Sequence, residues 1–184
     1  MSIEANYRRV SPKRFAELEA NQEAAHYFFH PFENPDDDPD DVISRLEDEE
    51  ASLQIFRLGK EWHALHFLLT GESDLTGPSR VPPPFGDVVQ GGTPTGFDAT
   101  YGPVRALSPD RVRAVADALH TISASELEQR FDPERFNALR IYPNPQPGGW
   151  EEEDLDTLLE LYPRLVEFFT RAAEAGDMVL LSSD

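Results

Sequence analysis

Two histidines in an apolar segment are the strongest candidates for chemistry in this sequence. His63 and His66 lie three residues apart, so on a helix their side chains project to neighbouring parts of one face. A pair of imidazoles at the mouth of a pocket could bind an anion or carry a proton. In the structural alternative, which we favour, His66 shares a buried stripe with Trp62 and is held by a backbone carbonyl, while His63 points to solvent.

Arginine and aromatic residues extend this set of candidates. Arg105 follows a turn at Tyr101 and could bind a carboxylate or phosphate with two hydrogen bonds. In so acidic a chain, however, pairing with an internal Asp or Glu is favoured. Tyr142 and Trp150 flank a loop and suit an interface, or they cover one end of the core. The candidate binding residues are therefore Trp62, His63, His66, Tyr101, Arg105, Tyr142 and Trp150.

The sequence lacks the marks of a metal or cofactor site. His26 and His30 have a spacing that can hold one ion, but the third and fourth ligands of a metal site are missing. The absence of cysteine excludes disulfides, thiolate nucleophiles and cysteine-based zinc sites. Nucleophile-elbow, phosphate-loop and dinucleotide-binding motifs are also missing. We expect no metal and no cofactor, and the sequence assigns no catalytic residue.

Charge narrows the choice of partners. The formal net charge of −19 repels nucleic acid and anionic lipid and would attract a basic protein. The alternative is that the charge serves solubility and reflects genome composition or a salty cytoplasm. The chain shows no secretory signal and no apolar run of membrane-spanning length. We therefore expect a cytoplasmic protein that binds neither nucleic acid nor membranes.

Helix caps and apolar stripes predict most of the helices. Serine or aspartate followed by proline typically starts a helix, as at Ser11, Ser108 and Asp132. Ser123 with Glu126 forms a capping box. The stripes and stop signals predict helices over 12–20, 23–29, 60–70, 109–120 and 151–175, with shorter helices after Ser123 and Asp132.

Strands and loops complete the predicted fold. Apolar and alternating segments favour strands near 3–10, 53–58, 101–107 and 178–182, with a short one at 85–89. Proline and acidic residues predict a loop at about 31–41, and a Gly/Pro-rich loop covers about 71–96. Helices and strands do not alternate regularly. The sequence therefore predicts a single compact α+β domain with a small mixed sheet packed with several helices.

Several segments together resemble a known family. Residues 62–71 read WHALHFLLTG, and further similarities follow in order: NYRRVSP at 6–12, YGPVRALSP at 101–109, RFDPERFNALRIYP at 130–143, Trp150, and the final helix leading into DMVLL. This pattern resembles the YfbM-like family of uncharacterised bacterial proteins over nearly the whole chain, 1–184. The resemblance implies a compact α+β domain of bacterial origin and no particular activity. Residues 33–41 and 78–84 look like additions to the family pattern.

Two classes of function follow from these features. We favour a non-catalytic binding protein, of the immunity type that neutralises a basic protein. The alternative is a small hydrolase in which His63 or His66 acts as general base beside Arg105 and a carboxylate. An enzyme should gather the candidate residues around one cleft, whereas a binding module should disperse them into separate core contacts.

Overall fold

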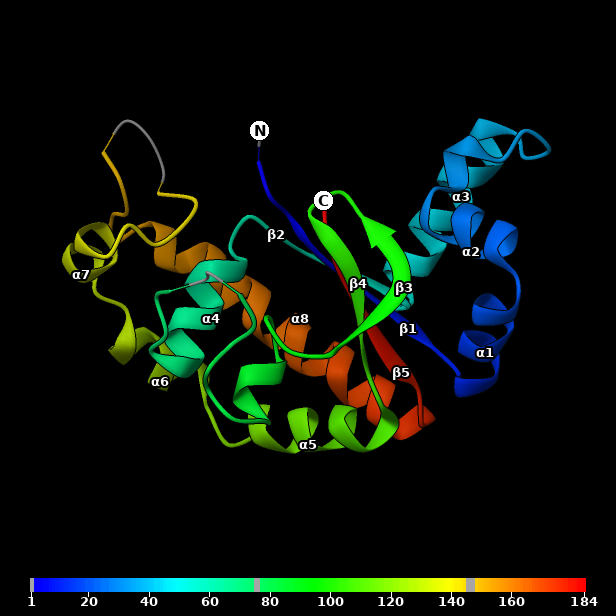
Figure 1. Ribbon diagram of the computed structural model, residues 1–184. Helices are drawn as coiled ribbons and strands as arrows, with labels where there is room; N and C mark the ends of the chain where they lie inside the picture. The colour runs from blue at the N-terminus through cyan, green and yellow to red at the C-terminus, as the bar shows by residue number, and fades with distance from the viewer. Residues whose placement is uncertain (1, 75–76, 145–147) are drawn as a thin grey trace.

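Both ends of the chain contribute to the middle of the sheet. The computed structural model describes residues 2–74, 77–144 and 148–184 (Figure 1). Strand β1 (Ala5–Val10) pairs with β5 (Met178–Ser183), with Tyr7 opposite Leu181. The other strands are β2 (Ile55–Gly59), β3 (Thr93–Ala99) and β4 (Gly102–Leu107), and the strand order is β2-β1-β5-β4-β3.

All four strand pairings are antiparallel. The α+β class is thereby confirmed, while the expected mixed sheet is corrected to an antiparallel one. The helical connections from β1 to β2 and from β4 to β5 each return the chain in the opposite direction, so neither of them forms a parallel crossover. The turn between β3 and β4 is a short hairpin, and β1 and β5 meet although they lie at opposite ends of the chain.

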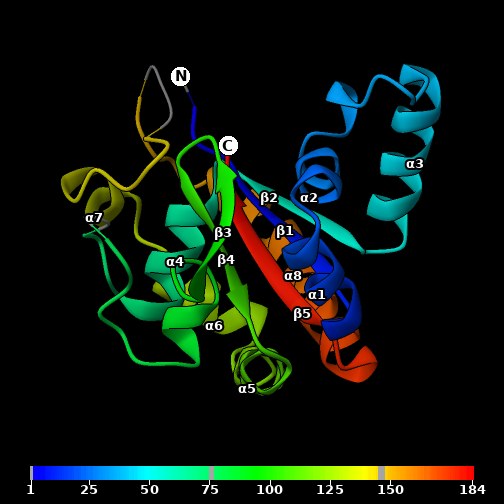
Figure 2. The same ribbon diagram turned by 45° about the vertical axis from the view of Figure 1, so that its right-hand side comes forward.

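The main core lies between one face of the sheet and three helices. Helices α4 (Trp62–Thr70), α5 (Pro109–Leu119) and α8 (Asp154–Ala175) cover this face (Figures 1 and 2). Tyr7 of β1 packs against Phe168 and Phe169 of α8, with both ring centroids 5.9 Å away. The apolar stripe of the last helix is thus confirmed as a core-facing surface.

Two short helices extend the core beyond the sheet. They are α6 (Ala124–Arg130) and α7 (Pro133–Ala138). The predicted capping box is present: Ser123 accepts from the Glu126 backbone N–H, and the Glu126 carboxylate accepts from the Ser123 N–H. Asp132 likewise caps α7 by accepting from the Arg135 N–H.

The second face of the sheet is covered by the N-terminal helices. These are α1 (Pro12–Ala20), α2 (Gln22–Phe29), the 3₁₀ turn η1 (Pro31–Glu33) and α3 (Pro39–Ala51). A smaller apolar cluster lies here, built on Val10, Val104, Ala106 and Leu180. Both views place the label of α3 away from those of α4–α8, although Ser52 at the end of α3 accepts a hydrogen bond from Arg171 of α8 at 3.4 Å (Figures 1 and 2). Among the described helices, none has the length and apolar character needed to cross a membrane.

Three segments differ from the sequence-based expectation. Residues 85–89 do not form a strand: Phe85–Asp87 is a 3₁₀ turn (η2), fixed by the ion pair between Asp87 and Arg111. The Gly/Pro-rich region contains the start of β3, whose strand signal is hidden by Pro94 and Gly96. Helix α3 begins inside the acidic loop, because Asp38 caps its first turn and Pro39 occupies its first position.

Candidate functional site

Helix α4 carries both candidate histidines and is buried on every side. All residues from 62 to 69 are buried, and Gly71 ends the helix in the left-handed conformation at φ 74°. The helix contacts η2, α6 and α8, so no face is left for solvent. His63 is consequently only 4% exposed and His66 is fully buried. The expectation that His63 points to solvent is wrong.

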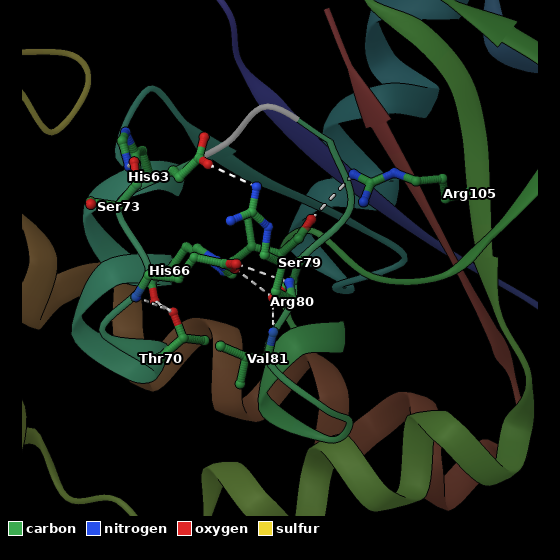
Figure 3. Close-up of polar contacts among 11 residues, drawn as sticks. His63, His66, Thr70, Ser73, Ser79, Arg80, Val81 and Arg105 are labelled. Carbon is green, nitrogen blue, oxygen red and sulfur yellow. Dashed lines mark hydrogen bonds and ion pairs between the residues drawn. The ribbon is translucent and has the colours of Figure 1, made fainter.

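His66 is held by a carboxylate rather than by a backbone carbonyl, which corrects the expectation. Its Nε2 lies 2.9 Å from Oε2 of Glu72, and the same oxygen accepts from Ser79 Oγ at 2.6 Å (Figure 3). The other carboxylate oxygen accepts from the Arg80 N–H at 2.9 Å. Burial lowers the pKa of His66, although Glu72 opposes this change. Its Nδ1 is buried and has no hydrogen-bond partner among the described residues.

The Glu72 carboxylate is therefore a structural acceptor for the loop that follows α4. Burial on its own would raise the pKa of Glu72, but the hydrogen bonds from Ser79, Arg80 and His66 outweigh burial and lower it. Ser79 donates to Glu72 and not to His66, so the three groups do not form a nucleophile–base–carboxylate chain. Instead, they tie residues 79–80 to the end of α4.

His63 joins two backbone segments. Its Nδ1 accepts from the Tyr142 N–H at 2.9 Å, which assigns the ring proton to Nε2. Nε2 then donates to the carbonyl of Ser73 at 3.2 Å. Burial lowers the pKa of His63 to about 4, even though the bond to Ser73 raises it. His63 is thus a neutral imidazole whose two nitrogens are both occupied at neutral pH.

Trp62 and Tyr142 complete a cluster of rings beside His63. The Trp62 ring lies 5.5 Å from the His63 ring and 5.6 Å from the Tyr142 ring. Trp62 Nε1 donates to the Ile3 carbonyl at 3.0 Å, and the Tyr142 hydroxyl accepts from the Ile3 N–H at 2.9 Å. The cluster anchors the segment before β1 to α4 and to the segment that contains Tyr142.

Trp150, Arg105 and Tyr101 lie elsewhere. Trp150 is 3% exposed and donates through Nε1 to the Ile141 carbonyl at 2.7 Å. Arg105 donates to the carbonyls of Val89 and Gly91 at 3.2 and 2.8 Å, so the expected pairing with Asp or Glu is corrected. Burial lowers the pKa of Arg105. Tyr101 is 39% exposed at the β3–β4 turn.

The structure therefore brings together only part of the predicted site. Trp62, His63 and Tyr142 meet and His66 follows one turn later, but their polar atoms bind other parts of the fold. Four cavities in the described part of the chain are lined by none of the seven candidates. No group of three or more potential metal-binding side chains is found among the residues described.

One of these four cavities lies on the second face of the sheet and was missed from the sequence. It has a volume of about 320 Å³ and lies between the strands, α2 and η1. Arg8 of β1 lines it and also lines a neighbouring cavity of about 690 Å³. The available signal was the strand alternation in residues 5–10, which turns Arg8 away from the core-facing Tyr7.

Comparison with known proteins agrees with this fold. The family model described as a domain of unknown function, DUF1877, matches residues 1–182. The chain belongs to the DUF1877 family. It is also similar to the crystal structure of YfbM, a protein of unknown function from Escherichia coli, with a TM-score of 0.63 and 20% identity. That match covers 97% of this chain and 98% of the other.

These relatives support the family resemblance and the fold, and they assign no function. No curated protein sequence matches the chain. The DUF1877 description and the YfbM structure both state that the function is unknown. Any activity of this DUF1877 member must therefore be argued from its own residues.

Proposed function

We propose that this protein is a non-catalytic interaction protein that binds a basic protein partner through α3 and the preceding turn. The observation that carries the proposal is an exposed apolar side chain on α3, set among acids that make no ion pair with any described residue. Ile43 is 44% exposed. Asp40 and Glu47 lie three residues before and four residues after it, on the same helix face.

The acids around Ile43 are available to a partner. Asp40, Asp41, Glu47 and Asp48 are exposed, and within the described residues none of their side chains makes an ion pair. Their charges would steer a basic protein toward α3 and accelerate association. Phe32 in η1 is 61% exposed and supplies a second apolar contact near the start of this element. Buried apolar anchors supply most of the affinity at such surfaces.

The contacts of the histidines favour this proposal over the hydrolase alternative. A general base needs a free lone pair within reach of a substrate. The Nδ1 lone pair of His63 accepts from the Tyr142 N–H, and Nε2 of His66 bonds to Glu72. The Nδ1 of His66 has no partner among the described residues, but His66 is fully buried and out of reach of a substrate. Arg105 binds backbone carbonyls. The cytoplasm is the proposed location, with an immunity-type role in neutralising a basic protein.

A designed peptide tests the proposed surface. The probe is a synthetic amphipathic helix with Lys and Leu at helical spacing, and its twin carries Glu in place of Lys. Isothermal titration calorimetry should detect binding of the basic peptide only. Ile43→Ser and Glu47→Lys should each weaken this binding about tenfold or more, because each removes either the anchor or its flanking charge.

A matched charge reversal separates this surface from bulk charge. Glu128 is an exposed acid on α6, and Glu128→Lys changes the net charge by the same amount as Glu47→Lys. The affinity of the Glu128→Lys variant for the basic peptide should stay within about twofold of that of the unmodified chain. An equal loss in both variants would show that only net charge attracts the peptide. Equal binding of the acidic twin would refute an acidic docking surface altogether.

A further inference from the structure

Arg8 occupies an unusual position on the second face of the sheet. The alternation of β1 directs Tyr7 into the main core and Arg8 to the opposite side. There it lies between Ile55 of β2 and Leu180 of β5, its partners in the strand register. Its guanidinium carbon is 4.8 Å from the centre of the Phe28 ring, and its side chain is 19% exposed.

The guanidinium of Arg8 makes no hydrogen bond to the residues that the structure describes. It has five N–H donors, yet none donates to any of the residues described. The carboxylate within ion-pair distance is Glu49, whose Oε2 lies 3.8 Å away. A charge-assisted hydrogen bond is about 2.7–2.9 Å long. By contrast, Arg111 donates through two nitrogens to both oxygens of Asp87.

Neighbouring charges leave Arg8 poorly compensated. Burial lowers its pKa, Glu49 and, more weakly, Asp184 oppose this effect, and Arg57 and Arg45 add to the lowering. A partly buried cation with open donors is costly unless it is paired with an anion. Within residues 2–74, 77–144 and 148–184, no such anion lies at hydrogen-bond distance from Arg8.

The cavity beside Arg8 combines an apolar floor with this open cation. Ile55, Val104 and Leu180 contribute from three strands, and Phe29 and Phe32 contribute from α2 and η1. Its volume of about 320 Å³ lies in the range of small-molecule sites. Figures 1 and 2 show the N-terminal helices beside the second face of the sheet, where this cavity lies.

The acids at the cavity favour a singly charged ligand. Glu33 is bound to His26 at 2.8 Å, and Asp184 accepts hydrogen bonds from Asn6, Ser182 and Thr100. Asp98 is exposed at the rim. These carboxylates would repel a dianion such as phosphate more strongly than a monocarboxylate.

We propose that this cavity binds a small organic monocarboxylate with an apolar body, whose carboxylate accepts two hydrogen bonds from Arg8. The planar guanidinium matches a carboxylate in a bidentate arrangement. The apolar body of the ligand lies over Ile55, Val104 and Leu180. This site shares Phe32 with the proposed docking surface, but Arg8 and the strand residues of the cavity lie outside α3. Either proposal can therefore hold without the other.

Titration of the full chain with phenylacetate tests the proposal. Two-dimensional ¹H–¹⁵N NMR should show saturable shifts at the amides of Arg8, Leu180 and Ser182. Phenylacetamide, which is neutral, and inorganic phosphate, which lacks an apolar body, should each bind at least about tenfold more weakly. Arg8→Gln should weaken phenylacetate binding by a similar factor.

Two further variants make the result decisive. Arg113 is an exposed arginine on α5, and Arg113→Gln removes the same charge and should change the affinity less than about twofold. Arg8→Lys keeps the charge but loses the planar guanidinium that makes two hydrogen bonds, so this variant should bind phenylacetate with intermediate affinity. It replaces Arg8→Gln as the test if that variant does not fold. Absence of saturable shifts, equal binding of phenylacetamide, or an equal loss in Arg113→Gln would each overturn the proposal.

Discussion

The ring nitrogens of His63 bind main-chain groups from two different segments, one on each side of α4. Its Nδ1 accepts a hydrogen bond from the Tyr142 N–H, and its Nε2 donates one to the Ser73 carbonyl. Trp62, the preceding residue, makes the corresponding bond to Ile3. Adjacent side chains on one buried helix thus fix three separate pieces of backbone. Loss of either side chain should therefore lower the free energy of unfolding.

We expect Trp62→Ala and His63→Ala both to lower the free energy of unfolding substantially. Truncation of a buried aromatic side chain costs about 3–5 kcal/mol. Removal of the imidazole leaves the Tyr142 N–H and the Ser73 carbonyl without partners, at about 1–3 kcal/mol each. Urea denaturation measures both values. His120→Ala, which removes an exposed imidazole bonded to Thr170, is the control and should cost less than about 1 kcal/mol.

This expectation replaces a milder one based on sequence. If His63 pointed to solvent, His63→Ala would lower the free energy of unfolding by less than about 1 kcal/mol, as surface substitutions usually do. The observed burial reverses that estimate. A loss in His63→Ala as small as that in His120→Ala would show that the two backbone groups find other partners.

Stability should also fall as the pH drops from about 6.5 toward about 4 because of His63. Burial lowers the folded-state pKa of His63 to about 4 from the ordinary histidine value of 6.5, so in this window the unfolded chain binds the additional proton. Relative to neutral pH, this proton uptake lowers the free energy of unfolding by about 2 kcal/mol at about pH 5. Burial lowers the pKa of His66 as well, which acts in the same direction.

Urea titrations at a series of pH values measure this dependence. Replacement by Gln removes the titrating group, so the His63→Gln variant should lose less stability than the unmodified chain between about pH 7 and about pH 5. Parallel curves for the two proteins would mean that His63 is protonated in the folded state without penalty.

At the scale of secondary-structure elements, the N-caps illustrate how far local chemistry determines helix starts. Ser108 and Ser123 both precede helices and both are exposed. The Ser123 hydroxyl accepts from the Glu126 N–H, and the Glu126 carboxylate bonds back to Ser123. Ser108 makes no side-chain cap bond, and α5 starts with Pro109 instead. The same residue type therefore contributes differently in the two places.

Replacing each serine by alanine should reveal this difference. Ser123→Ala should destabilise the protein by about 1 kcal/mol, because the N-terminal N–H groups of α6 lose their acceptor. Ser108→Ala should cost only a few tenths, about 0.3 kcal/mol. Urea denaturation of both variants at neutral pH provides the comparison. Equal losses would indicate that the Ser108 hydroxyl caps α5 in solution.

At the scale of the whole molecule, the two faces of the sheet differ in how completely they are covered. The first face carries the large core formed with α4, α5 and α8, whereas the second carries a small cluster and the cavity beside Arg8. The proposed ligand site and the proposed docking surface on α3 both lie on the side of the second, less covered face of the sheet. The net charge of −19 gives the molecule many acidic surface regions. Exposed apolar side chains therefore serve to distinguish a docking surface from the other acidic regions.

The sequence by itself determined the α+β class, the family and most helix starts, because caps, prolines and stripes act within a few residues. The burial of Trp62 also followed from its stripe. Sequence could not place β3, since pairing with β4 overrides its Pro94 and Gly96. Only the tertiary structure decided that His63 is buried and that Arg8 borders a cavity, because both depend on elements that are distant in the chain. Residues 73 and 142 meet His63, and β5 and α2 enclose Arg8, through contacts that no local pattern encodes.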